Sequence, residues 1–267
     1  MIDYDFKEKY SCEDFIEIMK LLRSPGGCPW DIEQTHESIK KNLIEETYEV
    51  IEAINKKDVS LMREELGDLF MQVIFHTIME EEKGNFNFDD VVDEVSKKLI
   101  IRHPHVFGDV NAETVDQVLT NWDAIKKNTK GQKTTTESML SVPRELPALM
   151  RAAKVQKKAA DVGFDWDNVS EAFVKINEET DELRAAIENN DTENIDEEFG
   201  DLLFAAVNVS RFLKIDAEES LTKATDKFLK RFSLVEEKCK ERGIDMKSAS
   251  LAVLDSIWDE IKHSENF

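Results

Sequence analysis

The feature that most constrains this chain is an acidic pattern that occurs twice with the same internal spacing. In the first copy, E-E-x-x-E at Glu45–Glu49 precedes E-x-G-D at Glu65–Asp68. In the second copy, the same two motifs stand at Glu178–Glu182 and Glu198–Asp201. Clustered carboxylates repel one another, and a hard cation such as Mg²⁺ removes that repulsion because it prefers oxygen ligands. The repeated clusters therefore predict two metal sites.

Other features recur around the acids in the same order, which indicates an internal duplication of about 120 residues. The matched segments are Pro29-Trp30-Asp31 with Asp165-Trp166-Asp167, Lys98 and Arg102 with Lys227 and Arg231, and Trp122-Asp123-Ala124-Ile125-Lys126 with Trp258-Asp259-Glu260-Ile261-Lys262. We therefore expect a first domain at 1–127, a linker at 128–142 and a second domain at 143–267. Residues 128–136 are polar and favour an exposed linker.

The chain is expected to be all-α. It holds only 9 Gly and 5 Pro in 267 residues, and no segment alternates apolar and polar residues in the manner of a strand. The spacing of apolar residues predicts helices over 13–23, 36–56, 59–83, 88–101, 114–127, 147–162, 168–190, 192–214, 217–241 and 247–263. We expect these helices to pack against one another as in a four-helix bundle.

A formal net charge of −22 bears on the partners of the chain. Binding to nucleic acid or to an anionic membrane is disfavoured because both need basic surface. A small anionic substrate would need a cation and a few well-placed Lys or Arg. No apolar run approaches the ~20 residues of a membrane span, and the N-terminus does not read as a signal peptide. Three widely spaced cysteines fit a reducing compartment, so a cytoplasmic protein is expected.

Helical geometry explains how the acids could converge. At about 100° per residue, Glu45, Glu46 and Glu49 fall on one side of a helix, and apolar residues fall on the other. Glu65 and Asp68 share a face of the next helix, because residues three apart are neighbours. Two facing helices would thus aim four or five carboxylates at one place. The competing interpretation is a solvated Glu-rich surface, which the recurrence of the same acids in the same register disfavours.

The residue types in the clusters limit which metal ions could bind there. They contain neither His nor Cys, and oxygen-only ligation favours Mg²⁺, Mn²⁺ or Ca²⁺ over Zn²⁺. A di-iron carboxylate site, whose motif is Glu-x-x-His, is a weaker alternative. Glu33-x-x-His36 and Glu260-x-x-His263 match that motif, but both lie outside the repeated clusters.

Two further groups have open interpretations. Lys227 and Arg231 are four residues apart, so both point one way; they could receive phosphate oxygens or pair with neighbouring Glu. Trp258 could stack on a base or pack in a core. Trp30 and Trp166 are expected to be core anchors.

The residues together resemble a known family. Gly26-Gly27-Cys28-Pro29-Trp30-Asp31, the two E-E-x-x-E…E-x-x-D clusters and Arg102-His103-Pro104-His105-Val106-Phe107-Gly108-Asp109 are similar to those of the MazG nucleoside triphosphate pyrophosphohydrolases. The resemblance covers nearly the whole chain. It implies tandem all-α MazG domains, a homodimer, and Mg²⁺-dependent hydrolysis of nucleoside triphosphates, with broad base tolerance, to a monophosphate and pyrophosphate.

The resemblance also implies a set of site residues in the C-terminal domain. The metal ligands would be Glu179, Glu182, Glu198 and Asp201, with Glu178 as our candidate for the group that takes a proton from water. The nucleotide would be met by Lys175, Ile176, Asn177 and Glu178, by Asn194, Ile195, Asp196 and Glu197, and by Asn208, Lys227, Arg231 and Trp258. Mn²⁺ is a possible substitute for Mg²⁺.

The N-terminal repeat keeps its acids, so a second metal site at Glu46, Glu49, Glu65 and Asp68 is expected. It departs elsewhere, because Phe75 stands at the position of Asn208, and Gln72 at that of Ala205. An equivalent second active site is therefore in doubt. Two rival functions remain open: a narrow dUTP or dCTP pyrophosphatase of the same superfamily, and a non-catalytic helical regulator that binds nucleotide or a protein.

Overall fold

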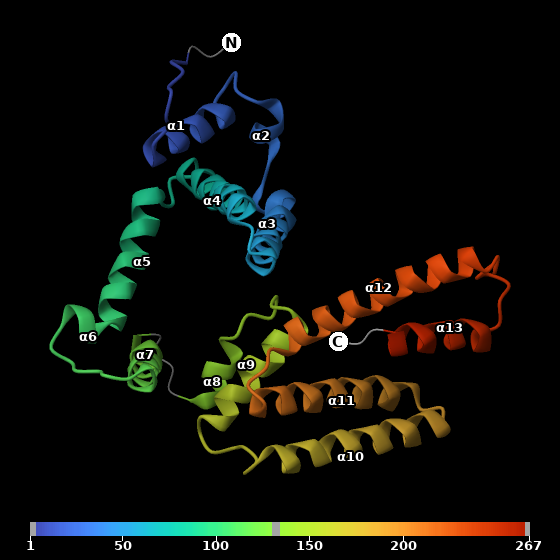
Figure 1. Ribbon diagram of the computed structural model, residues 1–267. Coiled ribbons are helices and arrows are strands. Elements are labelled where there is room, and N and C mark those ends of the chain that lie inside the picture. The colour runs from blue at the N-terminus through green and yellow to red at the C-terminus, as the bar shows by residue number, and fades with distance from the viewer. Residues whose placement is uncertain (1–3, 130–133, 265–267) are drawn as a thin grey trace. The chain divides into compact units, whose positions relative to one another are not determined.

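The computed structural model describes residues 4–129 and 134–264, and every regular element in them is a helix (Figure 1). The all-α prediction is confirmed for these residues. Contacts within the chain divide it into unit 1, Met1–Lys126, and unit 2, Lys127–Phe267. Among the described helices, none combines the length and the apolar character that a membrane crossing requires.

Unit 1 is built around an antiparallel helix pair, α3 and α4. The helices of this unit are α1 (Cys12–Arg23), α2 (Pro29–Glu33), α3 (His36–Lys56), α4 (Val59–Glu81), α5 (Phe88–Arg102), α6 (Pro104–Phe107) and α7 (Val115–Thr129), the last of which ends just beyond the division. Unit 2 contains the corresponding pair, α10 and α11. Its helices are α8 (Thr135–Leu140), α9 (Ala148–Ala160), α10 (Val169–Glu188), α11 (Thr192–Phe212), α12 (Ala217–Glu241) and α13 (Leu251–Ser264).

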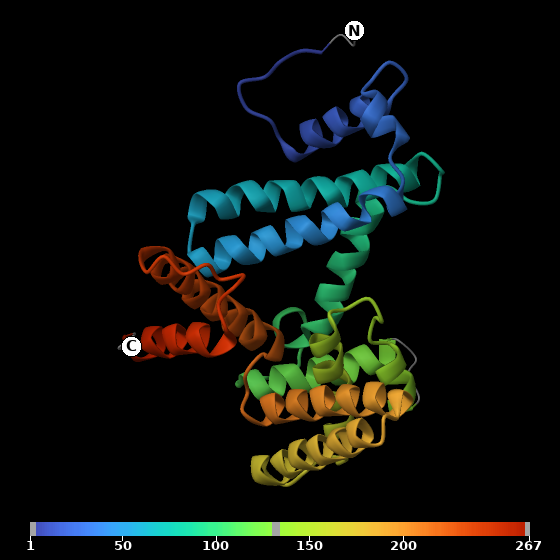
Figure 2. The same cartoon turned by 90° about the vertical axis from the view of Figure 1, so that its right-hand side faces the viewer.

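A short turn joins the two helices of each pair, as Figure 2 shows for α3 and α4 and Figure 1 for α10 and α11. In unit 1, Lys57 adopts a left-handed conformation with φ 55°, and the side chain of Asp58 then caps α4. In unit 2, Asn190 has φ 53°, and Asp191 caps α11. A carboxylate at this position accepts hydrogen bonds from N–H groups that the first turn leaves unpaired. The duplication read from the acids thus extends to the turn that sets the register of each pair.

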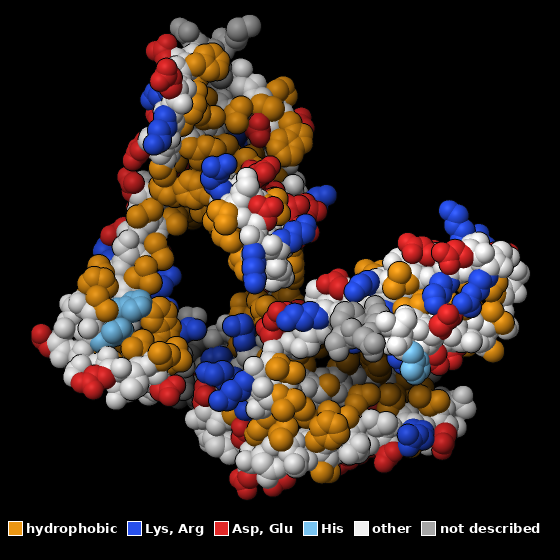
Figure 3. All heavy atoms as spheres, in the orientation of Figure 1, with side chains coloured by type: hydrophobic (Ala, Val, Ile, Leu, Met, Phe, Trp, Pro, Cys, Tyr) orange, Lys and Arg blue, Asp and Glu red, His pale blue; other side chains and the backbone are white. Residues whose placement is uncertain are grey.

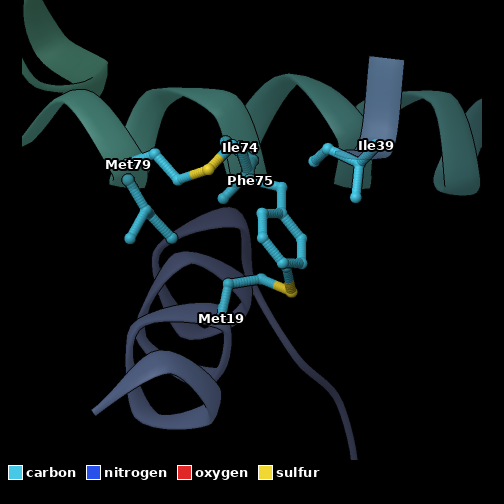
Figure 4. Close-up of a cluster of buried hydrophobic side chains, with 6 residues drawn as sticks. Met19, Ile39, Ile74, Phe75 and Met79 are labelled. Carbon is cyan, nitrogen blue, oxygen red and sulfur yellow. The ribbon is translucent and has the colours of Figure 1, made fainter. Parts of the chain in front are cut away.

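Each unit has a separate buried cluster. In unit 1, side chains from α1, α3 and α4 meet at Met19, Ile39, Ile74, Phe75, Ile78 and Met79 (Figure 4). In unit 2, α12 and α13 enclose Val235, Cys239, Ile257 and Ile261. Trp258, for which the sequence allows either stacking on a base or packing in a core, packs against this second cluster. Trp30 and Trp166 are instead 58% and 44% exposed, so the expectation that they anchor a core is wrong.

The structure differs from the predicted helices at several short segments. Pro29–Glu33 and Pro104–Phe107 form single turns, because proline suits the first helical position. The last helix begins at Leu251 rather than at 247. Where a linker was expected, Thr135–Leu140 forms α8, which a capping box between Thr134 and Glu137 starts. Residues 130–133 of the expected linker lie outside the described residues.

The cluster of unit 1 yields a stability prediction. Ile74 is 0% exposed, so Ile74→Ala leaves a cavity among the side chains of α1, α3 and α4. We expect it to reduce the free energy of unfolding of this unit by about 2–5 kcal/mol. Amide hydrogen exchange of peptides from these helices, measured by mass spectrometry, reports this loss. Val59→Ala, at a position 79% exposed, is the control, and an equal loss in both variants would contradict the assignment.

Candidate metal centre

The predicted acids of unit 2 meet between α10 and α11. Glu179, Glu182 and Glu198 each place one carboxylate oxygen so that these oxygens lie within 4.8 Å of one another. Asp201 follows Glu198 by one turn of α11 and lines a pocket together with Glu179. Glu179 is only 7% exposed, so this carboxylate is buried within the helix pair. Three of the four predicted ligands therefore converge directly, and the fourth lies beside them.

The proximity of these acids has an electrostatic cost. Loss of surrounding water raises the pKa of Glu198, and the negative charges of Glu182, Glu179 and Asp201 raise it further. The ionised form of the Glu198 carboxyl is therefore disfavoured. A divalent cation would reverse that balance, because its charge offsets the repulsion and its preferred ligands are oxygens.

One cation is already close to the acids. The Lys175 ammonium, one turn before Glu179 on α10, lies 2.7 Å from Glu179 Oε1 and 3.0 Å from Glu178 Oε2. Its hydrogen bond to Glu179, followed by the one to Glu178, raises the pKa of Lys175, so the ammonium stays charged. Lys175 thus partly neutralises the cluster. Glu178 is exposed and faces the same ammonium, which brings it to the edge of the metal centre.

A pocket of about 490 Å³ opens beside the acids, within the range typical of ligand sites. It lies between α9, α11 and the loop of residues 161–168, with α10 at its edge. Its lining is Val155, Gln156, Ala159, Gly163, Phe164, Asp165, Trp166, Lys175, Glu179, Asp201, Phe204, Ala205, Asn208 and Arg211. Most of this surface is apolar or aromatic, and the carboxylates stand at one end.

Polar groups at the other end form a small network. Arg211 donates to Asn208 Oδ1 through Nε at 3.2 Å and through Nη2 at 2.9 Å. The same guanidinium forms an ion pair with Asp165 from the 161–168 loop. Asp165 also accepts a hydrogen bond from the backbone N–H of Trp166 at 2.9 Å. The network therefore ties the end of α11 to the loop that forms one wall of the pocket.

Sequence reasoning found Asn208 but missed Arg211 and Gln156. Asp201, Asn208 and Arg211 are spaced seven and three residues apart, so they share one stripe of α11. A search of that stripe beyond the acids could have identified Arg211. Gln156 is buried on α9 and donates to the backbone oxygen of Phe204 at 2.8 Å. Nothing in its sequence context signals this role, because α9 and α11 meet only in the fold.

Several predicted contacts with nucleotide lie elsewhere in unit 2. Ile176 and Asn177 are on α10, and residues 194–197 are in the first turns of α11. Lys227 and Arg231 are on α12, and Trp258 on α13 has its ring 5.3 Å from that of Phe228. None of these residues lines the pocket beside the acids. Their predicted contacts with nucleotide therefore stay predictions.

Unit 1 repeats the acids but not their surroundings. Glu46, Glu49 and Glu65 also place carboxylate oxygens within 4.8 Å of one another. Loss of water, followed by the charge of Asp68, raises the pKa of Glu46. Loss of water and the charges of Glu49 and Asp68 likewise raise the pKa of Glu65. The predicted second cluster thus forms.

The position of Asn208 is occupied in unit 1 by Phe75, and that of Arg211 by Ile78. Both side chains are buried in the cluster with Met19 from α1. Core packing therefore takes the place that the polar network occupies in unit 2. Gln72, at the position of Ala205, is buried as well.

The histidines of the weaker di-iron alternative have other partners. His36 contacts His76, with 2.7 Å between their Nδ1 atoms, and Glu80, with 2.6 Å from His36 Nε2 to Glu80 Oε1. His263 Nδ1 lies 2.6 Å from the backbone oxygen of Asp259. Neither histidine belongs to an acidic cluster described above.

Comparison with known proteins agrees with this geometry. A family model described as the MazG nucleotide pyrophosphohydrolase domain matches residues 34–107 and 168–235. Each matched segment contains one helix pair with its acids. The chain belongs to the MazG family, and the resemblance inferred from its motifs is confirmed.

Individual relatives match almost the whole chain. A nucleoside triphosphate pyrophosphohydrolase of Escherichia coli strain K12 is 44% identical over 255 residues, which are 94% of this chain and 96% of that protein. The nucleoside triphosphate pyrophosphohydrolase/pyrophosphatase MazG of Thermotoga maritima is 44% identical over 250 residues, 94% and 95% of the two chains. YabN of Bacillus subtilis is 49% identical over 254 residues, 94% of this chain but 51% of that protein.

The raised pKa of the Glu198 carboxyl yields a prediction. The pKa of Glu198 is raised in the folded chain above 4.5, so this group favours folding only while protonated. That contribution is complete below about pH 4.5 and is lost as the pH rises through the raised pKa, so at pH 7 the charge opposes folding. We expect Glu198→Gln to raise the Tm of the metal-free protein at pH 7, and to reduce the further rise that MgCl2 produces.

Calorimetry in EDTA and then in increasing MgCl2 checks both effects. Glu236→Gln makes the same chemical change at an exposed position of α12 and serves as the control. It should leave both the metal-free Tm and the Mg²⁺ response unchanged. A full Mg²⁺ response in Glu198→Gln would show that Glu198 does not bind the ion.

Proposed function

We propose that this chain hydrolyses nucleoside triphosphates, with broad base tolerance, to the monophosphate and pyrophosphate. One observation carries the proposal: the carboxylates of Glu179 and Asp201 line a largely apolar pocket that could hold a nucleoside. Phosphates would then lie over the acids. Membership of the MazG family and the names of the relatives support the same reaction.

The acids of unit 2 fit a magnesium ion. Oxygen atoms from Glu179, Glu182 and Glu198 converge, Asp201 lies beside them, and neither His nor Cys takes part. This donor set favours Mg²⁺, with Mn²⁺ as a substitute. Bound there, Mg²⁺ would offset the charge of the triphosphate and of the leaving pyrophosphate.

The remaining residues have roles that follow from their positions. Glu178, at the edge of the cluster, would accept a proton from the attacking water as the bond between the α- and β-phosphates breaks. Lys175 would stabilise negative charge on the phosphates. Lys227 and Arg231 would contribute further positive charge, and Trp258 a contact to the nucleotide outside the pocket. Residues 176, 177 and 194–197 would complete the contacts to the nucleotide.

We further propose that the chain acts as a homodimer. Apolar side chains along α10 and α11 are exposed, including Phe173, Val174, Phe199 and Leu203. Figure 3 shows hydrophobic side chains at the surface of this helix pair. A single pair cannot cover both of its faces, and the same pair from a second copy would complete a four-helix bundle. A cytoplasmic location is part of the same proposal, and the free thiols of Cys12, Cys28 and Cys239 suit a reducing compartment.

The dimer is tested by light scattering coupled to size exclusion. We expect the parent to elute with twice the chain mass of 30.7 kDa. Phe199→Glu places a charge on the exposed face of α11 and should yield monomers. The control is Val59→Glu, at a position 79% exposed in unit 1, which should not change the mass. A monomeric parent would contradict the dimer.

The reaction is tested by comparing the two repeats. Glu179→Ala removes a buried carboxylate that lines the pocket, and we expect pyrophosphate release from ATP with Mg²⁺ to fall by at least about 100-fold. Glu46→Ala makes the same change at the matched position of unit 1 and should cost much less, because core side chains replace the polar network there. The products are identified by chromatography, with an α,β-non-hydrolysable analogue as the control for the bond broken.

Unchanged turnover in Glu179→Ala would refute the assigned metal centre. Equal losses in two stably folded variants would show that both repeats contribute equally to the reaction. Release of phosphate instead of pyrophosphate would place the broken bond elsewhere.

A further inference from the structure

The polar end of the pocket has a fixed hydrogen-bonding polarity. Asn208 offers an amide oxygen and an amide NH2, and the two are distinguished by what they contact. Two N–H groups of Arg211 point at Oδ1, at 3.2 and 2.9 Å. A guanidinium has donors and no acceptor, so the reversed amide would bring donors against donors. Asn208 therefore keeps its oxygen towards Arg211 and its NH2 on the opposite side.

Arg211 is itself held in place. Asp165 pairs with its guanidinium and simultaneously accepts from the N–H of Trp166. The guanidinium also lies 4.6 Å from the ring of Phe212. Restrained on these sides, Arg211 can fix the amide of its neighbour instead of following it.

The position of Asn208 relative to the acids indicates what it meets. It follows Asp201 by seven residues on the same helix, which is about 10 Å along the axis at 1.5 Å per residue. Phe204 and Ala205 line the pocket between them, and Phe164 and Trp166 contribute aromatic surface. With phosphates at Asp201, this distance leaves room for the ribose, and the apolar part of the pocket suits a flat nucleobase.

We propose that Asn208 donates its amide N–H to an acceptor on the nucleobase, and that Arg211 and Asp165 are positioning residues that hold the amide in this orientation. This inference rests on the proposed function. It assigns the base to the pocket between α9 and α11 and specifies the polarity of the contact. Every common base carries a carbonyl oxygen or a ring nitrogen that accepts a hydrogen bond, so a single donor is compatible with purines and pyrimidines alike.

The two repeats differ in this network. Phe75 and Ile78 stand at the matched positions of α4 and are buried against α1. Unit 1 therefore keeps the acids that could hold a cation but has no donor and no guanidinium at these two positions. A unit without counterparts of Asn208 and Arg211 would bind the ion without contacting a nucleobase at this position.

The experiment separates contact with the base from general effects on the site. Asn208→Asp keeps the shape of the side chain and its contact with Arg211 but removes the N–H donor. Arg211→Met removes the groups that orient the amide. Each variant is assayed for pyrophosphate release from ATP, GTP, CTP and UTP, and from ribose 5-triphosphate, which has the same phosphates and sugar but no base. Arg184→Met, on an exposed side chain of α10 paired with Asp181, is the matched control.

We expect both pocket variants to lower kcat/KM for all four nucleotides by about tenfold, and to change kcat/KM for ribose 5-triphosphate by less than about twofold. The control should behave as the parent with every substrate. An equal loss with ribose 5-triphosphate would overturn the proposal, because the residues would then act on the sugar, the phosphates or the fold. Full activity of both variants on the nucleotides would overturn it as well.

Failure of the proposed function would look different. A parent that releases no pyrophosphate from any of these compounds would contradict the reaction and not the pocket. Calorimetric titration of the same variants with AMP and with ribose 5-phosphate then tests the pocket directly. Binding of AMP that is weakened by both substitutions, with ribose 5-phosphate unaffected, supports the base contact, and equal binding of AMP by parent and variants refutes it.

Discussion

Repulsion between carboxylates held on two paired helices is the constraint on which this structure depends. Four acids in each unit share a small region, and loss of surrounding water together with the neighbouring negative charges raises the pKa values of Glu46, Glu65 and Glu198. Such an arrangement persists because each helix pair is fixed by its turn and its own packing. In unit 2, Lys175 offsets part of the charge, and a divalent ion would offset more. The electrostatic cost in the metal-free state is therefore the same property that would give the site an affinity for a cation.

The duplicated helix pairs show how one scaffold can support two sites of different content. Both pairs keep the left-handed turn residue, the aspartate cap and the converging acids. They diverge two turns beyond the acids, where unit 2 has Asn208 and Arg211 and unit 1 has Phe75 and Ile78. That difference follows from what packs against the helix. In unit 1, Met19 from α1 meets these side chains in a closed core, whereas in unit 2 a pocket lies between α9 and α11.

The helices and the acids were predictable from sequence because both depend on local spacing. Residues 36–56 and 217–241 form helices with the predicted bounds, and Glu179, Glu182 and Glu198 meet as the spacing indicated. The pocket was not predictable, because it depends on α9 meeting α11 and on where the 161–168 loop lies. The ion pair that holds Arg211 comes from Asp165, far away in the sequence, and spacing along α11 does not reveal it. Trp166 likewise lines a pocket instead of a core, since its exposure is decided by that loop and not by its own type.

Exposed apolar side chains on α10 and α11 connect the stability of unit 2 to its chemistry. Phe199 follows Glu198 directly on α11, and Leu203 stands one turn later, so the apolar face and the acidic cluster share one short helix. Covering that face with a second copy would exclude water beside the carboxylates. Lower local polarity strengthens the attraction between acids and a divalent ion, and equally strengthens their mutual repulsion when the ion is absent. Association and ion binding should therefore favour each other, since each lowers the free-energy cost of the other.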